Sequence, residues 1–291
     1  MSDQLRRFIF DNTNVRGQWV NLEATWRAVL ERHDYPPVLQ QVLGELMVAA
    51  SLLSSMLKFT GALILQIQGS GPVRLIVVEC ASDQTLRATA KWEGELEGGL
   101  RTLVGDGRFV ITIAQADAKQ TYQGIVELRG DTVAEVLQHY MSTSEQLETR
   151  LWLASAPTRC AGLLLQRLPH SGQETQDDPD AWERAVTIAK TVQPDELLRL
   201  PCERLLHRLY HQERVRLFDS SVMSFRCSCT RDRVANMLRM LGPDEVHGIL
   251  TEREEIEVHC EFCNRRYAFD RVDAEQLFAA QHITGAGSTR H

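Results

Sequence analysis

The sequence is organised around two cysteine pairs near its end, Cys227-Ser228-Cys229 and Cys260-Glu261-Phe262-Cys263, with thirty residues between them. Four of the seven cysteines of the chain lie in these two pairs. Alternate side chains of an extended segment share a face, so both cysteines of the C-x-C pair point the same way. A C-x-x-C pair brings its two thiols together across a turn, so the two pairs together provide four sulfur ligands for one tetrahedral metal ion.

The metal expected at such a site is zinc, one Zn²⁺ per chain. Sulfurs about 2.3 Å from one zinc ion lie roughly 3.8 Å from each other, a relaxed distance for both pairs. With every position taken by a thiolate, no position is open for water or substrate, so we expect a structural or redox site and not an enzyme. The predicted ligands are Cys227, Cys229, Cys260 and Cys263.

The residues between the pairs predict a compact helical module. Thr230 can cap a helix that Gly242 ends, and Pro243 begins a second, shorter helix. Spacing places one apolar face on each helix. The residues expected to point inward are Val234, Met237, Leu238, Leu241, Val246, Ile249 and Leu250.

A strand follows these helices and leads into the second cysteine pair. Residues 255–260 alternate strictly between polar and apolar side chains, which places Cys260 on the apolar face. His259 therefore points away from the metal. We expect neither His259 nor His247 to replace a cysteine as a ligand.

These residues resemble the redox switch of the heat-shock protein 33 family, whose pattern is C-x-C, some thirty residues, then C-x-x-C. Asn264 stands where many members have Gly, but Asn tolerates a left-handed backbone. The resemblance covers nearly the whole chain and is carried by Phe225 to Val234, Leu241 to Val246, Ile256 to Asn264, Tyr267-Ala268-Phe269, Ser144-Glu145-Gln146, Leu164 to Pro169 and Gly71-Pro72-Val73-Arg74.

The resemblance implies a redox-regulated, ATP-independent chaperone, a holdase that binds unfolding proteins under oxidative stress. It implies that the reduced, zinc-bound form is inactive, that oxidation activates it, and that the oxidised form is a homodimer. A disulfide needs sulfurs about 2.05 Å apart, so oxidation cannot leave a zinc tetrahedron intact. Proximity favours disulfides between Cys227 and Cys229 and between Cys260 and Cys263, with loss of zinc and unfolding of the module.

Upstream, residues 1–170 predict a large α+β domain. The chain has 291 residues, of which 43% are hydrophobic and 24% charged, enough for a sizeable core. A run of sequential strands favours an antiparallel or mixed sheet over repeated βαβ units. Strands are expected at 8–10, 16–22, 62–68, 73–80, 85–92, 108–114, 121–128, 147–156 and 161–168, and helices at 23–33, 38–58 and 132–140.

Two stretches of this domain have a second interpretation. The helix at 38–58 is apolar enough to suggest a membrane span, but polar residues such as Glu45 and Lys58 interrupt it, which favours a core helix. Gly69-Ser70-Gly71-Pro72 is followed by a strand rather than a helix, which excludes a phosphate loop. No signal peptide precedes Phe8, so we expect a cytoplasmic protein without membrane contact.

The composition changes after Pro169, where residues 171–180 are polar and acidic. We place a domain boundary here and predict a metastable helical linker over 171–222, followed by a zinc-binding redox-switch domain over 223–291. Short helices in the linker are marginal in water and need a neighbour to pack on. Their apolar positions are Trp182, Ala185, Val186, Ala189, Val192, Leu205, Leu206, Leu209 and Tyr210.

The two cysteine pairs could also belong to a nucleic-acid-binding zinc ribbon or to a thiol oxidoreductase. A nucleic-acid-binding zinc ribbon needs positive charge, but residues 221–291 hold nine Lys and Arg against eleven Asp and Glu, and the whole chain carries −7. A thiol oxidoreductase places its C-x-x-C where a strand enters a helix, whereas 264–269 predicts a strand. The remaining cysteines, Cys80, Cys160 and Cys202, are expected to be small buried hydrophobes.

Overall fold

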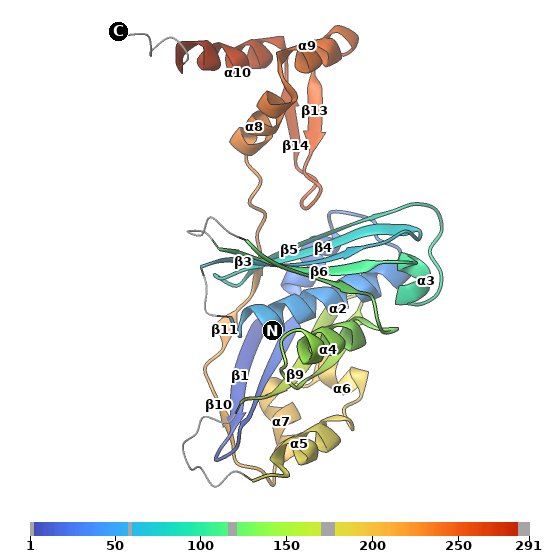
Figure 1. Ribbon diagram of the computed structural model, residues 1–291, viewed down its shortest axis with the longest axis vertical. Helices are drawn as coiled ribbons and strands as arrows, with labels where there is room; N and C mark the ends of the chain where they lie inside the picture. The colour runs from blue at the N-terminus through green and yellow to red at the C-terminus, as the bar shows by residue number, and fades with distance from the viewer. Residues whose placement is uncertain (1–2, 58–59, 116–120, 170–177, 285–291) are drawn as a thin grey trace. The chain divides into compact units, whose positions relative to one another are not determined.

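The computed structural model describes residues 3–57, 60–115, 121–169 and 178–284 (Figure 1). Contacts divide the chain into two compact units, Met1–Arg226 and Cys227–His291. Most of the acidic stretch 171–180 lies outside the described residues, and so does Lys58. The linker predicted over 171–222 packs, where it is described, within the first unit; its separate behaviour stays a prediction.

The first unit contains two sheets. One has four long antiparallel strands in the order β1-β2-β9-β8, and two short strands pair with the outer side of β1. Their bounds are β1 (Gln4–Phe10), β2 (Val15–Leu22), β8 (Thr149–Ala156), β9 (Arg159–Arg167), β10 (Val215–Leu217) and β11 (Ser221–Val222). Strand β2 pairs with β9 some 150 residues later, and β1 pairs with β10 and β11 more than 200 residues later, so this sheet joins the two ends of the first unit's sequence.

The second sheet has the order β12-β5-β4-β3-β6-β7 and is antiparallel except for the parallel pair β12 and β5. Its strands are β3 (Gly61–Gln68), β4 (Val73–Ala81), β5 (Thr85–Trp92), β6 (Arg108–Gln115), β7 (Tyr122–Glu127) and β12 (Ser224–Phe225). This confirms the α+β class predicted from sequential strands. One helix, α3 (Leu100–Val104), was not predicted, because five residues between glycines are too few to show a period.

Helix α2 (Pro37–Ser54) forms the centre of the larger core of the first unit and contacts strands of both sheets (Figure 1). Leu43, Leu46 and Met47 are fully buried. Among the described residues, α2 is the one helix long and apolar enough to cross a membrane, but 72% of it is buried inside the protein, as in a core helix. Two further helices, α1 (Ala24–Leu30) and α4 (Val133–Thr143), complete this core.

The opposite face of the first sheet is covered by the linker helices α5 (Ala181–Ala189), α6 (Pro194–Arg199) and α7 (Cys202–Tyr210). Alternation along β9 shows the two faces: Leu164 packs in the α2 core, whereas Leu163 and Leu165 pack against the linker helices. All nine apolar positions predicted for these helices are buried. Pro194 is the first residue of α6 and Pro201 caps α7, so each proline begins a helix.

The second unit is a small module with its own core. It contains α8 (Arg231–Leu241), α9 (Pro243–Glu252), β13 (Ile256–His259), β14 (Arg266–Phe269) and α10 (Arg271–Thr284). Its buried apolar residues are Ala235, Leu238, Val246, Leu250, Ile256, Tyr267, Phe269, Ala274, Leu277 and Phe278. Helix α10 was not predicted, although Ala274, Leu277 and Phe278 have helical spacing.

One prediction for this module is wrong in part. Leu238 and Val246 are buried as expected, but Met237 is 41% exposed and Leu241 is 52% exposed. Helix α8 contacts its small module along a narrow stripe through Ala235 and Leu238, and a stripe of this width leaves the rest of the apolar face uncovered.

Candidate metal centre

The first cysteine pair lies in an extended segment at the start of the second unit. No helix or strand includes Cys227 or Cys229, and α8 begins directly after them. Thr230 has extended φ and ψ angles, and its side chain accepts a hydrogen bond from the Arg233 amide, which caps α8 as predicted. The Arg233 guanidinium donates to the Ser228 hydroxyl at 2.6 Å, so the residue between the two cysteines is also held.

The second pair lies in the turn that joins β13 to β14. The Cys260 amide donates to the Arg265 carbonyl at 3.0 Å, and the Asn264 amide donates to the Cys260 carbonyl at 2.7 Å. Asn264 has a φ of 56°, the left-handed conformation that Gly adopts freely and Asn tolerates. Asn264 therefore provides the left-handed turn residue at this position.

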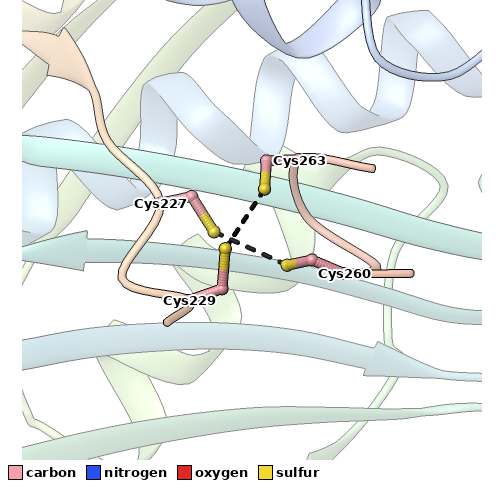
Figure 2. Close-up of side chains that lie close together, drawn as sticks. All are labelled: Cys227, Cys229, Cys260 and Cys263. Atoms are coloured by element: carbon pink, nitrogen blue, oxygen red, sulfur yellow. Dashed lines mark hydrogen bonds between the residues drawn. The ribbon is translucent and has the colours of Figure 1, made fainter. Parts of the chain in front are cut away.

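These two segments bring all four sulfurs together (Figure 2). The four sulfur atoms lie within 4.8 Å of one another. Cys227 Sγ is 3.6 Å from Cys260 Sγ, and Cys229 Sγ is 3.3 Å from Cys263 Sγ. Around one zinc ion sulfurs lie roughly 3.8 Å apart, so the cluster has the size of a tetrahedral four-sulfur site. The four cysteines could hold one metal ion.

The electrostatics of the cluster favour a bound cation. Burial raises the pKa of Cys263 to about 12 and also raises the pKa of Cys260. Burial acts in the same direction on Cys229, but hydrogen bonds from the Tyr267 hydroxyl and the other thiols outweigh it and bring that pKa down to about 7. Four thiolates this close repel each other, so a divalent cation at their centre would let all four stay ionised.

Tyr267 is a further residue of the site that the sequence did not identify. Its hydroxyl donates a hydrogen bond to Cys229 Sγ at 3.1 Å, and its ring is buried in the core of the module. Hydrogen bonds of this kind orient metal ligands and stabilise their charge. The alternation along 266–269 predicts that Tyr267 faces inward with Phe269, but nothing in the sequence shows that its hydroxyl reaches a sulfur.

The metal centre adjoins the core of the module. Cys229 and Cys260 pack against its buried residues. At the start of α8, Arg231 lies over the ring of Phe269 at 4.2 Å and pairs with Asp273 at 2.7 Å. These contacts join α8, β14 and α10, which position the two cysteine pairs, so the metal and the small core support each other.

Neither His259 nor His247 takes part in the four-cysteine cluster. His259 is exposed and lies 3.7 Å from Glu257 on the outer side of β13, and the ring of His247 lies against Phe278. The C-x-x-C turn leads into strand β14, as expected for a metal knuckle and unlike a strand-to-helix oxidoreductase site.

The other three cysteines are buried in the first unit, as predicted. Burial raises the pKa of Cys80 and of Cys202 to about 12 and that of Cys160 well above its ordinary value. Their thiols stay protonated at neutral pH, so they lack the thiolate that oxidants attack.

Comparison with known proteins identifies relatives along nearly the whole chain. The family model described as "Hsp33 protein" matches residues 3–270. A 33 kDa chaperonin of Methylobacillus flagellatus is 50% identical over 100% of this chain and 99% of its own length. One of Chromobacterium violaceum is 48% identical over 99% and 98%. The crystal structure of the 33 kDa chaperonin of Thermotoga maritima has a TM-score of 0.83 at 21% identity, over 96% of this chain and 99% of that one, which shows a shared fold.

Proposed function

The chain belongs to the Hsp33 family, and we propose that it is a redox-regulated, ATP-independent chaperone that holds unfolding proteins under oxidative stress. In the reduced form one zinc ion is bound by the four cysteines, and the protein is inactive. Oxidation forms two disulfides, releases zinc and activates client binding. The single observation that carries this proposal is the closed cluster of four sulfurs, which has no open position for a substrate.

The oxidation step follows from the sulfur distances. Each cysteine pair loses two electrons and forms one S–S bond, while one hydrogen peroxide accepts the two electrons and, with two protons, becomes two waters. An S–S bond of about 2.05 Å cannot form within a pair whose sulfurs are held roughly 3.8 Å apart around one zinc ion. Oxidation therefore removes metal ligands in pairs, and two peroxides per chain remove all four.

The pairing proposed is Cys227 with Cys229 and Cys260 with Cys263. In the folded cluster the short distances run across the two pairs, so proximity in space does not select sequence neighbours. Once the metal leaves, the fold no longer holds the two pairs together, whereas one or two intervening residues still tether the partners within each pair. Peptide mapping of the oxidised protein checks this; mainly Cys227 or Cys229 linked to Cys260 or Cys263 would contradict it.

The surface proposed for clients is the sheet face that the linker helices cover. Leu205 is fully buried, and Leu206 and Leu209 are each 5% exposed. Under them lie apolar side chains of the first sheet, among them Phe8, Phe10, Trp19, Leu163 and Leu165. Burying each of these side chains stabilises the packing of the helices on the sheet by about 1.5–3 kcal/mol. In the proposed mechanism the helices stay packed as long as their downstream end is anchored. Their release would expose a large apolar surface for unfolded segments.

The partners proposed are therefore unfolded or aggregation-prone proteins, together with a second copy of the chain when it is oxidised. A nucleic-acid partner is not proposed, because the chain and its zinc module are both net negative. The protein acts by binding and not by catalysis, and we place it in the cytoplasm, where thiols persist in the reduced state.

The experiment that tests the proposal measures zinc content and suppression of client aggregation in one sample, reduced and after peroxide. We expect one zinc per reduced chain and no holding activity, then loss of zinc together with the appearance of activity. Cys260→Ser should lose most of the zinc affinity, since three thiolates leave the shell incomplete. Cys202→Ser, at a buried cysteine outside the cluster, is the matched control and should keep its zinc. Activity that is independent of oxidation in the parent chain would refute the proposal.

A further inference from the structure

The segment that leads from the linker helices to Cys227 runs along the edges of both sheets of the first unit. We call residues 215–226 the strap. Its strands β10 and β11 pair with the outer side of β1 (Figure 1). Its strand β12 pairs with the outer side of β5. Without the strap, β1 and β5 are edge strands with unpaired backbone groups.

Backbone hydrogen bonds dominate the attachment of the strap. Its amides donate to carbonyls on or next to β1 and β5: Phe218 to Arg7 at 2.9 Å, Met223 to Asp3 at 3.1 Å, Ser224 to Gln84 at 3.3 Å and Arg226 to Leu86 at 3.0 Å. Two ion pairs, Arg216 with Asp11 and Arg226 with Asp83, are exposed and contribute little.

Few strap side chains are buried. Met223 is 2% exposed and belongs to the core around α2, and Phe225 packs against the same core beneath the Arg32 guanidinium, 4.1 Å from its ring. Val222 is 65% exposed and Phe218 39% exposed. The strap is thus held by main-chain pairing and by two pairs of apolar residues spaced two apart, Met223 with Phe225 in the α2 core and the partly buried Val215 with Leu217 against the linker-helix core, a pattern that many extended chains can supply.

We propose that the edges of β1 and β5, once the strap leaves them, bind extended segments of client proteins, which add to the sheets as strands. This proposal rests on the chaperone function proposed above and names the chemistry of its clients. The segment expected is extended, with apolar side chains at alternate positions that take the places of Met223 and Phe225. Main-chain recognition does not depend on sequence, which suits a protein that must hold many clients.

The place of the strap in the chain explains why the edges are covered in the reduced form. The strap ends at Arg226, directly before Cys227, so a metal bound by the four cysteines joins the downstream end of the strap to a folded module. Its strands have only two or three residues each, which is too short for stable pairing without that anchor. Loss of the metal frees one end, and the strap can peel from β1 and β5.

Hydrogen exchange on the full chain tests the proposal in three states: reduced with zinc, oxidised, and oxidised with a thermally unfolded client. Amides along these edges, such as that of Asp11 directly after β1, which donates to the Arg214 carbonyl directly before the strap, should exchange at least an order of magnitude faster after oxidation. They should regain protection when client is bound. Strand β7, the opposite edge of the second sheet, is the internal control and should not change.

A strap that cannot leave gives a second test. Gln4 and Val222 lie opposite each other in the β1–β11 pair, and the bond from Met223 to Asp3 shows that this is a non-hydrogen-bonded pair, whose side chains lie close together. The double variant Gln4→Cys, Val222→Cys should form a disulfide that locks the strap. After oxidation it should lose zinc and show fast exchange in α5 and α7, as the parent does, but hold several-fold less client. Each single variant is a control and should behave as the parent.

The outcomes separate the two proposals. If the locked variant holds client as well as the parent, or if β1 and β5 stay unprotected in the client complex, the edges are not client sites, although the chaperone function stands. Protection that returns with rising concentration of the oxidised chain alone would assign the edges to a second copy and overturn the client assignment. If the oxidised parent holds no client at all, the proposed function itself fails.

Discussion

The two compact units of this protein differ in what keeps them folded. Among the described residues, the larger core of the first unit contains 41 buried residues, whereas the core of the second contains ten. The second unit adds a cluster of four sulfurs that can hold a metal ion. Structural zinc contributes on the order of 10 kcal/mol to a small module, as much as a whole domain commonly has in reserve. Under the proposed function an oxidant removes this contribution from the second unit, whereas the described residues of the first unit contain no such metal-binding cluster.

Removal of the metal should produce the largest difference between the two units. A chelator, or peroxide, should unfold the second unit and then free the linker helices, because about 10 kcal/mol of metal binding is lost in the module alone. Hydrogen exchange should rise across 227–284 and over α5 to α7, while β2, β9 and α2 stay protected. An equal rise of hydrogen exchange in both units would show that they unfold together, and would contradict the view that only the second unit depends on the metal.

A truncated chain without the linker and the second unit tests the same difference without an oxidant. A chain that ends at Pro169 keeps the long strands of both sheets and the core around α2 apart from Met223, but loses the strap and the helices that cover Leu163 and Leu165. We expect it to be folded by circular dichroism and to suppress client aggregation without an oxidant. A folded but inert fragment, in both reducing and oxidising buffer, would exclude the idea that the removed part is an inhibitor.

A smaller effect is expected where the linker meets the sheet. Leu205→Ala removes a fully buried side chain from α7 and should weaken linker packing by about 2–5 kcal/mol. Exchange in α7 should rise in the reduced protein, and less oxidant should be needed for activation. Arg204→Ala, at the exposed neighbouring position, is the control, with an expected change within about 0.5 kcal/mol. Equal oxidant dependence of both variants would argue against the linker as the element that switches.

The smallest effect concerns the contact between Tyr267 and Cys229. Tyr267→Phe keeps the buried ring but removes the hydroxyl that donates to the sulfur, so metal affinity should fall by about 10- to 100-fold. Competition with a chelator measures this change. Tyr210→Phe removes a buried hydroxyl bond in the first unit, to the Ala185 carbonyl, and should leave metal affinity unchanged. If both variants bind metal as the parent does, the Tyr267 hydroxyl has no part in the metal centre.

Local patterns in the sequence were enough to predict the α+β class, most of the helices and strands, and the four cysteines as one cluster. Ligand spacing and side-chain period are properties of neighbouring residues, so they survive without knowledge of the fold. The errors have physical reasons as well. Met237 and Leu241 have the spacing of a buried face, but the module is too small to cover them, and α3 is too short to show a period.

The sequence by itself thus determined the chemistry of this protein: which residues can hold a metal, and that the segment after Pro169 forms short helices that need a partner. Only the tertiary structure decided what those helices cover, that the strap occupies the edges of β1 and β5, and that Tyr267 reaches Cys229. The reason is distance along the chain: Phe218 meets Arg7 across more than two hundred residues. No local pattern records such a pairing, because either strand could form the same hydrogen bonds with another edge.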